Sequence, residues 1–361
     1  MIHNSLFNSR ILVTGATGFV GSHLTEKLVN LGARVTATTH HPINPNSYFA
    51  TQKLEKKCKM IQIELTDFTS VRNLLTNNKQ PTTNNYFDFI FHLAAQPIVD
   101  IAYKNPKTTL YSNILGTINI LECARLSNHI KGIIVASSDK AYGKKNPKSE
   151  IRNPNKYLNS TTNRKYNIGL VSNFNIRDSN LKYIESDPLA GDHPYEVSKS
   201  ATDLIAHSYF KTYNLPIVIT RFGNIYGEGD IHFSRLIPGI IKAVICNKTF
   251  EIRSDGKFVR DYLYVKDVVS GYLLIAKNVE KVCGEAFNLG SEETLNVIEL
   301  IKLMEKVLSQ KIKYKIHNNQ KNEIPYQSLD YTKIRRSLGW KPKYSLEKTI
   351  RNIFTWYENN L

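Results

Sequence analysis

The sequence predicts an α/β protein with a doubly wound parallel sheet and a smaller, mostly C-terminal second domain. Two observations predict this class. Apolar stretches of strand length alternate with helical patterns along much of the chain, and a glycine-rich turn joins the first strand to the first helix. Such alternation builds right-handed βαβ units and a parallel sheet. Strands are expected at 10–13, 33–38, 60–65, 87–93, 132–136, 217–220 and within 285–291, and helices at 20–31, 68–76, 106–127 and 194–213.

The composition is that of a soluble globular protein, with 361 residues, 41% hydrophobic and 22% charged. No apolar run reaches the roughly 18 residues that a membrane span needs, and the N-terminal stretch MIHNSLFNSR lacks a signal-peptide core. The four cysteines stand far apart and form no CxxC pair. These features predict reduced thiols and a cytoplasmic protein with no membrane partner.

The net charge of +17 could indicate nucleic-acid binding. The lysines are scattered, however, without a long basic run or interleaved aromatic residues, and the chain is rich in both lysine and asparagine. We therefore expect no nucleic-acid partner. A basic cleft that attracts an anionic, phosphate-bearing substrate fits the same charge.

Residues 144–186 interrupt the alternation of strands and helices. The segment is rich in asparagine and shows little periodicity apart from a strand-like stretch at 168–176. A loop of this length is uncommon in a compact domain unless it is functional or mobile. It is interpreted either as a surface insertion or as a lid over the active site.

Gly15, Gly18 and Gly21 form the first chemical motif, and they lie between a strand and a helix. In this context the glycines allow a tight turn and a close approach of a pyrophosphate to the helix N-terminus. The motif predicts a Rossmann-type dinucleotide site. The acid usually found at the end of the second strand is replaced by the stretch 38–41, Thr-Thr-His-His, which leaves NAD and NADP both open. Asp67 could contact the adenine amino group, cap the helix at 68–76, or do both.

The second motif is Tyr195-x-x-x-Lys199, whose members share one face of a helix. A nearby ammonium is expected to stabilise a phenolate and to lower the tyrosine's pKa. A third group, Ser138, follows the apolar strand 132–136 and is itself followed by Asp139 and Lys140. An acid and a base therefore stand side by side at the end of a strand.

Together these motifs resemble the extended short-chain dehydrogenase/reductase superfamily of NAD-dependent epimerases and dehydratases. The matching segments occur in family order and span nearly the whole chain outside the insertion: TGATGFVGSHL, FHLAAQ, NILGTINILE, SSDKAYG, PYEVSKS, RFGNIYG and RDYLYVKD. The resemblance implies that Ser138 hydrogen-bonds the sugar hydroxyl being oxidised and that Tyr195 takes its proton. Lys199 would hold the nicotinamide ribose. NAD is the favoured cofactor, with NADP not excluded.

The same resemblance implies the remaining site residues and the assembly. It implies no metal. The helical faces at 106–127 and 195–213 would pair in a homodimer, although the sequence alone allows them to be core. Further cofactor contacts are expected from Thr17, Phe19, Val20, Leu93, Ala94, Ala95 and Asn113, and contacts to a nucleotide-sugar substrate from Gln96, Asn224, Arg235 and Arg260.

The pair of Asp139 and Lys140 separates the activities that this superfamily contains. Epimerases usually have small or apolar residues after the serine, because rotating a 4-keto sugar needs no further acid or base. A 4,6-dehydratase must also remove the C5 proton and protonate the departing C6 hydroxyl. Asp-Lys resembles the CDP-glucose 4,6-dehydratases and also the inverting dehydratases of UDP-N-acetylglucosamine, and the neighbouring segments favour the CDP-glucose type.

The expected function is therefore a nucleotide-sugar 4,6-dehydratase. We assign Asp139 as the acid at the C6 oxygen and Lys140 as the base at C5, while Lys140 could instead stabilise the enolate as a cation. A 4- or 2-epimerase and a non-enzymatic Rossmann protein that senses nucleotides or binds RNA remain alternatives. The expected domains are 1–227 with 261–291 for the cofactor, and 228–260 with 292–361 for the substrate.

Overall fold

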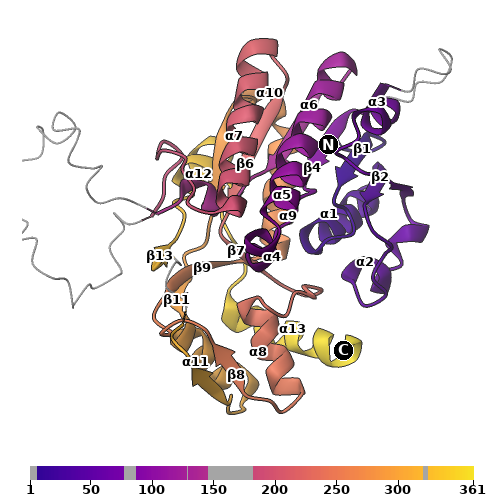
Figure 1. The fold of residues 1–361 in the computed structure, drawn as a ribbon. Coiled ribbons are helices and arrows are strands. Elements are labelled where there is room, and N and C mark those ends of the chain that lie inside the picture. The colour runs from indigo at the N-terminus through magenta and orange to yellow at the C-terminus, as the bar shows by residue number, and fades with distance from the viewer. Residues whose placement is uncertain (1–5, 77–86, 128, 145–181, 320–323) are drawn as a thin grey trace, which may run out of the picture.

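The computed structural model describes residues 6–76, 87–127, 129–144, 182–319 and 324–361. Most of the segment 144–186, including the strand-like stretch at 168–176, lies outside the described residues. The chain forms a larger lobe that contains the N-terminus and a smaller lobe that contains α8, α11 and the C-terminal helix (Figure 1). Among the described helices, none is both long and apolar enough to cross a membrane.

The larger lobe is built on a seven-stranded parallel sheet, which confirms the predicted fold class. The strand order is β10-β6-β5-β4-β1-β2-β3, so the direction of strand addition reverses between β1 and β4. In such sheets, ligands bind outside the carboxyl ends of the strands at this reversal. The strands are β1 (Arg10–Thr14), β2 (Arg34–Thr39), β3 (Lys59–Gln62), β4 (Phe89–His92), β5 (Gly132–Ala136), β6 (Ile217–Phe222) and β10 (Ala286–Leu289).

Helices cover both faces of this sheet, and the strands are accordingly apolar on both sides. In β1, Ile11 and Val13 belong to one core while Leu12 belongs to the other. The first core includes α1 (Phe19–Asn30) and α9 (Val265–Lys277), and the second includes α3 (Phe68–Thr76), α6 (Gly116–Ser127) and α7 (Pro194–Tyr213). Short helices complete the lobe: α2 (Tyr48–Thr51), η1 (Leu54–Lys56), α4 (Val99–Lys104), η3 (Asp139–Tyr142) and α10 (Val279–Val282).

The helix expected at 106–127 has the predicted limits but is not uniform. It consists of α5 (Pro106–Leu110), a π-helical turn η2 (Tyr111–Leu115) and α6. A π-turn adds a residue to one turn and re-aims the side chains within it. Here it contains Asn113, which is buried against the ends of β4 and α7.

The smaller lobe is built from short strands and helices of which the sequence predicted only the residue ranges. Its core contains Ile237, Ile240, Leu300, Ile301 and Ile350. Strand β9 pairs with β7, β11 and β13, while β8 pairs with β12. The elements are β7 (Asn224–Tyr226), α8 (Leu236–Ile245), β8 (Phe250–Ile252), β9 (Val259–Tyr264), β11 (Thr294–Asn296), α11 (Val297–Leu308), β12 (Tyr314–Ile316), β13 (Tyr326–Gln327) and α13 (Leu346–Asn360). Helix α12 (Thr332–Leu338) lies between β13 and α13 in the chain but packs against β10 of the larger lobe, where Ile334 joins the first core.

Candidate active site

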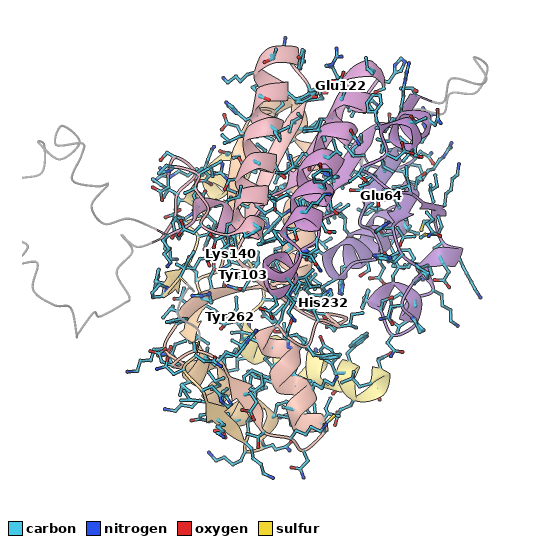
Figure 2. The ribbon with its side chains drawn as sticks, in the orientation of Figure 1. Glu64, Tyr103, Glu122, Lys140, His232 and Tyr262 are labelled. Carbon is cyan, nitrogen blue, oxygen red and sulfur yellow. The ribbon has the colours of Figure 1, made fainter. Side chains whose placement is uncertain are left out.

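A cavity of about 1100 Å³ lies where the two lobes meet, at the carboxyl ends of the central strands. Side chains from both lobes line it. Figure 2 shows four labelled side chains near the junction of the two lobes, namely Tyr103, Lys140, His232 and Tyr262. Glu122 lies away from them, toward the far end of α6. The volume is slightly above the range of about 300–1,000 Å³ that is typical of small-molecule sites.

The glycine motif forms one end of this region, between β1 and α1. Gly15 has φ +69°, and a Cβ at this position would lie 2.8 Å from the Ala94 Cα, so only glycine fits. A Cβ on Gly21 would lie 2.1 Å from the Gly15 carbonyl oxygen. Gly18 is the N-cap residue of α1 and makes no side-chain hydrogen bond to the first turn of the helix. This cradle brings the glycine turn against the segment after β4 and leaves the room that a pyrophosphate needs.

Hydroxyl and imidazole groups take the place of the missing acid after β2. Thr17 Oγ1 donates to Thr39 Oγ1 at 3.2 Å, and Thr39 Oγ1 donates to the His41 carbonyl at 2.6 Å. A carboxylate is still present at this edge, because Glu64 lies two residues after the end of β3 and pairs with His40 at 2.8 Å. The turn at Glu64 is also why β3 ends at Gln62 and not at residue 65 as expected.

Asp67 serves as the cap of α3. Its carboxylate accepts hydrogen bonds from the backbone N–H of Thr69 at 3.1 Å and of Ser70 at 3.3 Å. The helix-cap role that the sequence offered is therefore present. A contact between Asp67 and adenine stays a prediction.

Asn113 and Gln96 join the loop after β4 to the helices behind it. Asn113 Oδ1 accepts from the Gln96 backbone N–H at 2.7 Å, and its Nδ2 donates to Ser198 Oγ at 2.9 Å. The Gln96 side chain donates to Thr109 Oγ1 at 2.9 Å and to the Ile98 carbonyl at 3.0 Å. Both amides thus hold the shape of the loop, and Gln96 does not line the cavity in this arrangement.

Ser138 and Tyr195 meet at the wall of the cavity. Ser138 ends the loop after β5, and α7 begins at Pro194 so that Tyr195 stands in its first turn. Burial raises the pKa of Tyr195 to about 12, although the Arg235 guanidinium and a hydrogen bond between Tyr195 and Ser138 act in the opposite direction. The structure therefore brings together the two groups that the sequence placed around the reacting hydroxyl.

Lys199 lies one helical turn after Tyr195 but does not lower the pKa of that phenol as expected. Its Nζ donates to the Ala136 carbonyl at 2.8 Å, which directs the ammonium toward the end of β5. Burial lowers the pKa of Lys199 to about 8, and the Asp203 carboxylate partly offsets this. The cation that acts on Tyr195 is Arg235, from the smaller lobe. The expectation failed because burial is the largest influence on both groups.

The short helix η3 carries Asp139 and Lys140 and is held rigidly from behind. Its last residue, Tyr142, donates to Asn288 Oδ1 at 2.7 Å and accepts from Arg221 Nη1 at 2.7 Å. Arg221 is in turn paired with Asp203 by two hydrogen bonds of 2.8 and 2.9 Å, and both side chains are buried. A network of this kind fixes the position of the residues that it supports.

Asp139 and Lys140 lie beside Ser138 in the cavity wall. Ser138 Oγ donates to Asp139 Oδ1 at 2.9 Å and accepts from the Lys140 backbone N–H at 3.2 Å. Asp139 is 3% exposed, and its Oδ2 has no hydrogen-bond partner among the described residues. Lys140 Nζ donates to Gln327 Oε1 of β13. An acid and an amine are therefore both placed next to Ser138.

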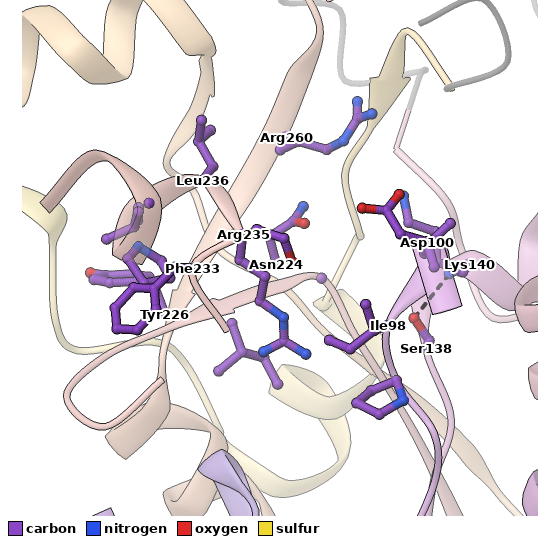
Figure 3. Close-up of a pocket in the computed structure, with 18 of the residues that line it drawn as sticks. Ile98, Asp100, Ser138, Lys140, Asn224, Tyr226, Phe233, Arg235, Leu236 and Arg260 are labelled. Carbon is purple, nitrogen blue, oxygen red and sulfur yellow. Dashed lines mark hydrogen bonds between the residues drawn. The ribbon is translucent and has the colours of Figure 1, made fainter. Parts of the chain in front are cut away.

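Three predicted substrate contacts line the opposite side of the cavity. Asn224, Arg235 and Arg260 face Ser138 and Lys140 across it (Figure 3). Arg235 precedes α8 and pairs with Asp230 at 3.1 Å. The Asn224 Nδ2 group is buried and has no partner among the described residues. Two guanidinium groups and an amide donor suit a nucleoside diphosphate.

A comparison of the sequence with family models decides the relationship. The model of the GDP-mannose 4,6-dehydratase family matches residues 12–158 and 177–353. The chain belongs to this family. It is 26% identical to a CDP-glucose 4,6-dehydratase from Salmonella typhimurium, over 97% of this chain and 90% of that protein. The predicted place in the epimerase/dehydratase superfamily is therefore confirmed, as is the prediction of a dehydratase-type enzyme.

Solved structures show the same fold. A UDP-glucuronic acid 4-epimerase from Bacillus cereus matches with a TM-score of 0.78 and 23% identity, over 97% of this chain and 99% of that one. A dTDP-glucose 4,6-dehydratase from Streptomyces venezuelae matches with a TM-score of 0.77 and 24% identity, over 97% of each chain. Epimerases and dehydratases thus share this architecture, and the fold alone does not separate them.

Sequence reasoning missed four residues at the site of this dehydratase-family protein. Glu64 stands near the missing acid, and Asp261 and Gln327 lie behind Asp139 and Lys140. His92 ends β4 and bonds Thr14 Oγ1 at 2.8 Å, and burial lowers its pKa to about 3. Of these, only Glu64 and His92 could have been found from the local sequence, because each is a polar residue at or just after the end of an apolar strand.

Proposed function

We propose that the protein is an NAD-dependent nucleotide-sugar 4,6-dehydratase. The main support is that Ser138 and Tyr195 line the same wall of the cavity as Asp139 and Lys140. Groups suited to oxidation and groups suited to water loss are therefore adjacent. The names of the relatives support the proposal, because the Salmonella protein is a CDP-glucose 4,6-dehydratase and the Streptomyces structure was solved with NAD bound. The site residues named below are part of this proposal.

In the first half of the reaction the C4 hydroxyl is oxidised. Tyr195 takes the hydroxyl proton, Ser138 hydrogen-bonds the same oxygen, and Lys199 holds the nicotinamide ribose. NAD, when bound, would supply the acceptor for the C4 hydride and the source of the hydride for C6. The positive charge of Arg235 lowers the pKa of Tyr195, which favours its action as a base.

In the second half the C5–C6 bond becomes double as water leaves. The 4-keto group acidifies the C5 proton, which passes to Lys140, and Asp139 protonates the departing C6 hydroxyl. The alternative in which Lys140 stays cationic and stabilises the enolate belongs to the same proposal. The product is a nucleotide-linked 4-keto-6-deoxy sugar.

CDP-glucose is the substrate that we favour. Its support is the likeness to the Salmonella enzyme and the Asp-Lys pair after the serine. The diphosphate would lie against Asn224, Arg235 and Arg260. We also propose that residues 228–260 and 292–361 form the substrate-binding part and that the remainder holds the cofactor. The four cysteines are free thiols, which suits the proposed cytoplasmic location.

The test separates the two halves of the reaction. Asp139→Asn keeps the side-chain size but delivers no proton, and Lys140→Ala removes the amine. Each should slow overall turnover of CDP-glucose by roughly 10²–10⁴-fold, the usual contribution of a positioned acid or base. Each should still reduce the bound cofactor in a single turnover, followed as nicotinamide absorbance. Tyr195→Phe should suppress that reduction.

Controls and an isotope experiment complete the test. Lys348→Ala removes an exposed lysine of α13 and should leave both halves unchanged. With substrate deuterated at C4, a dehydratase moves the label to C6 and takes up solvent hydrogen at C5. An epimerised product that keeps its 6-hydroxyl and carries the label at C4 would replace the proposal with a 4-epimerase. Assays with dTDP-, UDP- and GDP-glucose decide the nucleotide.

We further propose a homodimer formed through η2 and α7. Large apolar side chains on these elements are exposed in the single chain, with Tyr111 and Leu204 each 58% exposed and Tyr213 50% exposed. Light scattering should give the mass of a dimer. Leu204→Asp places a charge in the middle of this face and should shift the mass toward that of a monomer, whereas a monomeric native protein would refute the proposal.

A further inference from the structure

Buried polar atoms without hydrogen-bond partners collect behind Asp139 and Lys140. Among the described residues these atoms include Asp139 Oδ2, Asp261 Oδ1, Gln327 Nε2 and Ser328 Oγ. Asp261, Gln327 and Ser328 are each 0% exposed. Buried polar groups are nearly always paired, and each exception calls for an explanation. The proposed reaction uses only Asp139 of this group, so the other three have no assigned role.

Gln327 is the member of this cluster that touches the proposed chemistry. It lies on β13, which pairs with β9 so that Gln327 is opposite Arg260. From there its side chain reaches the larger lobe, and Lys140 Nζ donates to Gln327 Oε1. An ammonium only donates, so the amide oxygen must face it. The contact ties the amine of η3 to a strand of the smaller lobe.

The neutrality of this acceptor has a chemical consequence. A carboxylate at the same position would stabilise the ammonium and oppose the loss of its proton. An apolar side chain would leave a flexible lysine without a fixed acceptor. An amide oxygen holds the Nζ in place and adds no negative charge, so the amine can change its protonation state there.

We propose that Gln327 is a positioning residue that aims the Lys140 amine at the sugar and thereby serves the elimination half of the reaction and not the oxidation. The proposal rests on the dehydratase function proposed above. In this half, the C5–H bond breaks and its proton goes to Lys140. The C5 electron pair forms the C5–C6 double bond, and the C6 hydroxyl leaves with a proton from Asp139. Gln327 exchanges no proton in this sequence.

Two substitutions in the full-length protein test the assignment. Gln327→Glu keeps the shape and adds a charge, while Gln327→Leu removes the acceptor. Gln310→Glu makes the same charge change at an exposed position of the smaller lobe and is the matched control. With CDP-glucose, single-turnover reduction of the cofactor should stay within about twofold of the native rate in all three. Elimination should slow roughly 10- to 100-fold in Gln327→Leu.

The pH dependence gives a readout that a merely structural role would not move. In Gln327→Glu the rising limb of the elimination rate should move to higher pH, because the carboxylate favours the ammonium form of Lys140. This amine has its hydrogen-bond partner in residue 327 on β13. The charged or titratable groups near this contact are Asp139 on the same element, Arg260 and Asp261 on the neighbouring strand β9, and Lys182, whose charge acts on Asp261. Gln310→Glu should leave the limb where it is. Equal slowing of oxidation and elimination, or an unmoved limb, would overturn the assignment.

A second readout does not depend on turnover. Acetic anhydride modifies neutral amines, and mass spectrometry of the digested protein gives the labelling of Lys140 against pH. Labelling should require higher pH in Gln327→Glu than in the native protein or in Gln310→Glu. If the native protein makes no 6-deoxy product from any nucleotide sugar, the proposed function fails, and this labelling still decides whether Gln327 governs Lys140. Identical labelling curves for all variants would refute the positioning role.

Discussion

The buried carboxyl of Asp261 makes a stability prediction whose sign and size follow from the structure. Asp261 lies in β9 between two glycines, since a Cβ on Gly223 would be 2.1 Å from its Oδ1 and a Cβ on Gly290 would be 2.9 Å from its Oδ2. The Leu329 N–H donates to Oδ2 at 3.2 Å. Burial raises the pKa of Asp261 to about 7, and the charge of Asp139 adds to this, while hydrogen bonds from Leu329 and Ser291 and the charge of Lys182 oppose it.

The native state therefore binds a proton that the unfolded chain has already lost. An unfolded aspartate titrates near pH 3.9, so from about pH 4 to about pH 7 the native state holds more protons than the unfolded state. The free energy of unfolding must then fall as the pH rises through this window and level off above it. Three pH units correspond to about 4 kcal/mol as an upper bound. Relaxation around a buried charge makes about 1–3 kcal/mol the expected loss.

Asp261→Asn removes this titration and keeps the side-chain size. Urea unfolding at pH 5 and pH 8 should show the native protein losing about 1–3 kcal/mol more between these values than the variant does. The comparison is made between pH values, so any cost of fitting an amide beside Gly223 and Gly290 cancels. Asp100→Asn changes an exposed carboxyl in the same way and is the control. Equal losses for the native protein and Asp261→Asn would refute the reasoning.

Two further substitutions test the site and its support. Arg235→Gln removes a cation that lowers the pKa of Tyr195 and that faces the proposed diphosphate. The KM for the nucleotide sugar should rise about ten- to hundredfold, and the rising limb of the rate of cofactor reduction should move to higher pH. An unchanged KM together with an unmoved limb would contradict both roles. Asp203→Asn leaves the buried Arg221 guanidinium without its carboxylate. The free energy of unfolding in urea at pH 7 should therefore fall by about 3–5 kcal/mol. An unchanged urea midpoint would contradict the importance of this pair.

The sheet and the proposed oxidation residues were predictable because their signals are local. An apolar strand, a glycine turn and a helix specify the first βαβ unit within about thirty residues, and the structure places Gly15 in that turn and Gly21 in the first turn of α1. Ser138 follows a strand and Tyr195 begins a helix. Parallel strands carry such residues to one edge of the sheet, so their proximity follows from the alternation alone.

Energetic properties and long-range contacts were not predictable in the same way. The pKa of Tyr195 depends on how deeply the phenol is buried and on Arg235 from the other lobe, neither of which the spacing of Tyr195 and Lys199 contains. The π-helical turn around Asn113 breaks the 3.6-residue period without any glycine or proline inside the turn to signal it. Gln327 lies in a two-residue strand, which is too short for a periodic pattern.

The position of Gln327 also shows how the two proposed half-reactions depend differently on the fold. The groups proposed for oxidation, Ser138, Tyr195 and Lys199, are all carried by β5, its following loop and α7 of the larger lobe. The amine proposed for elimination is bonded to β13 of the smaller lobe. The smaller lobe therefore contacts the elimination amine directly through a hydrogen bond, whereas it acts on the oxidation groups through the charge of Arg235, which lowers the pKa of Tyr195.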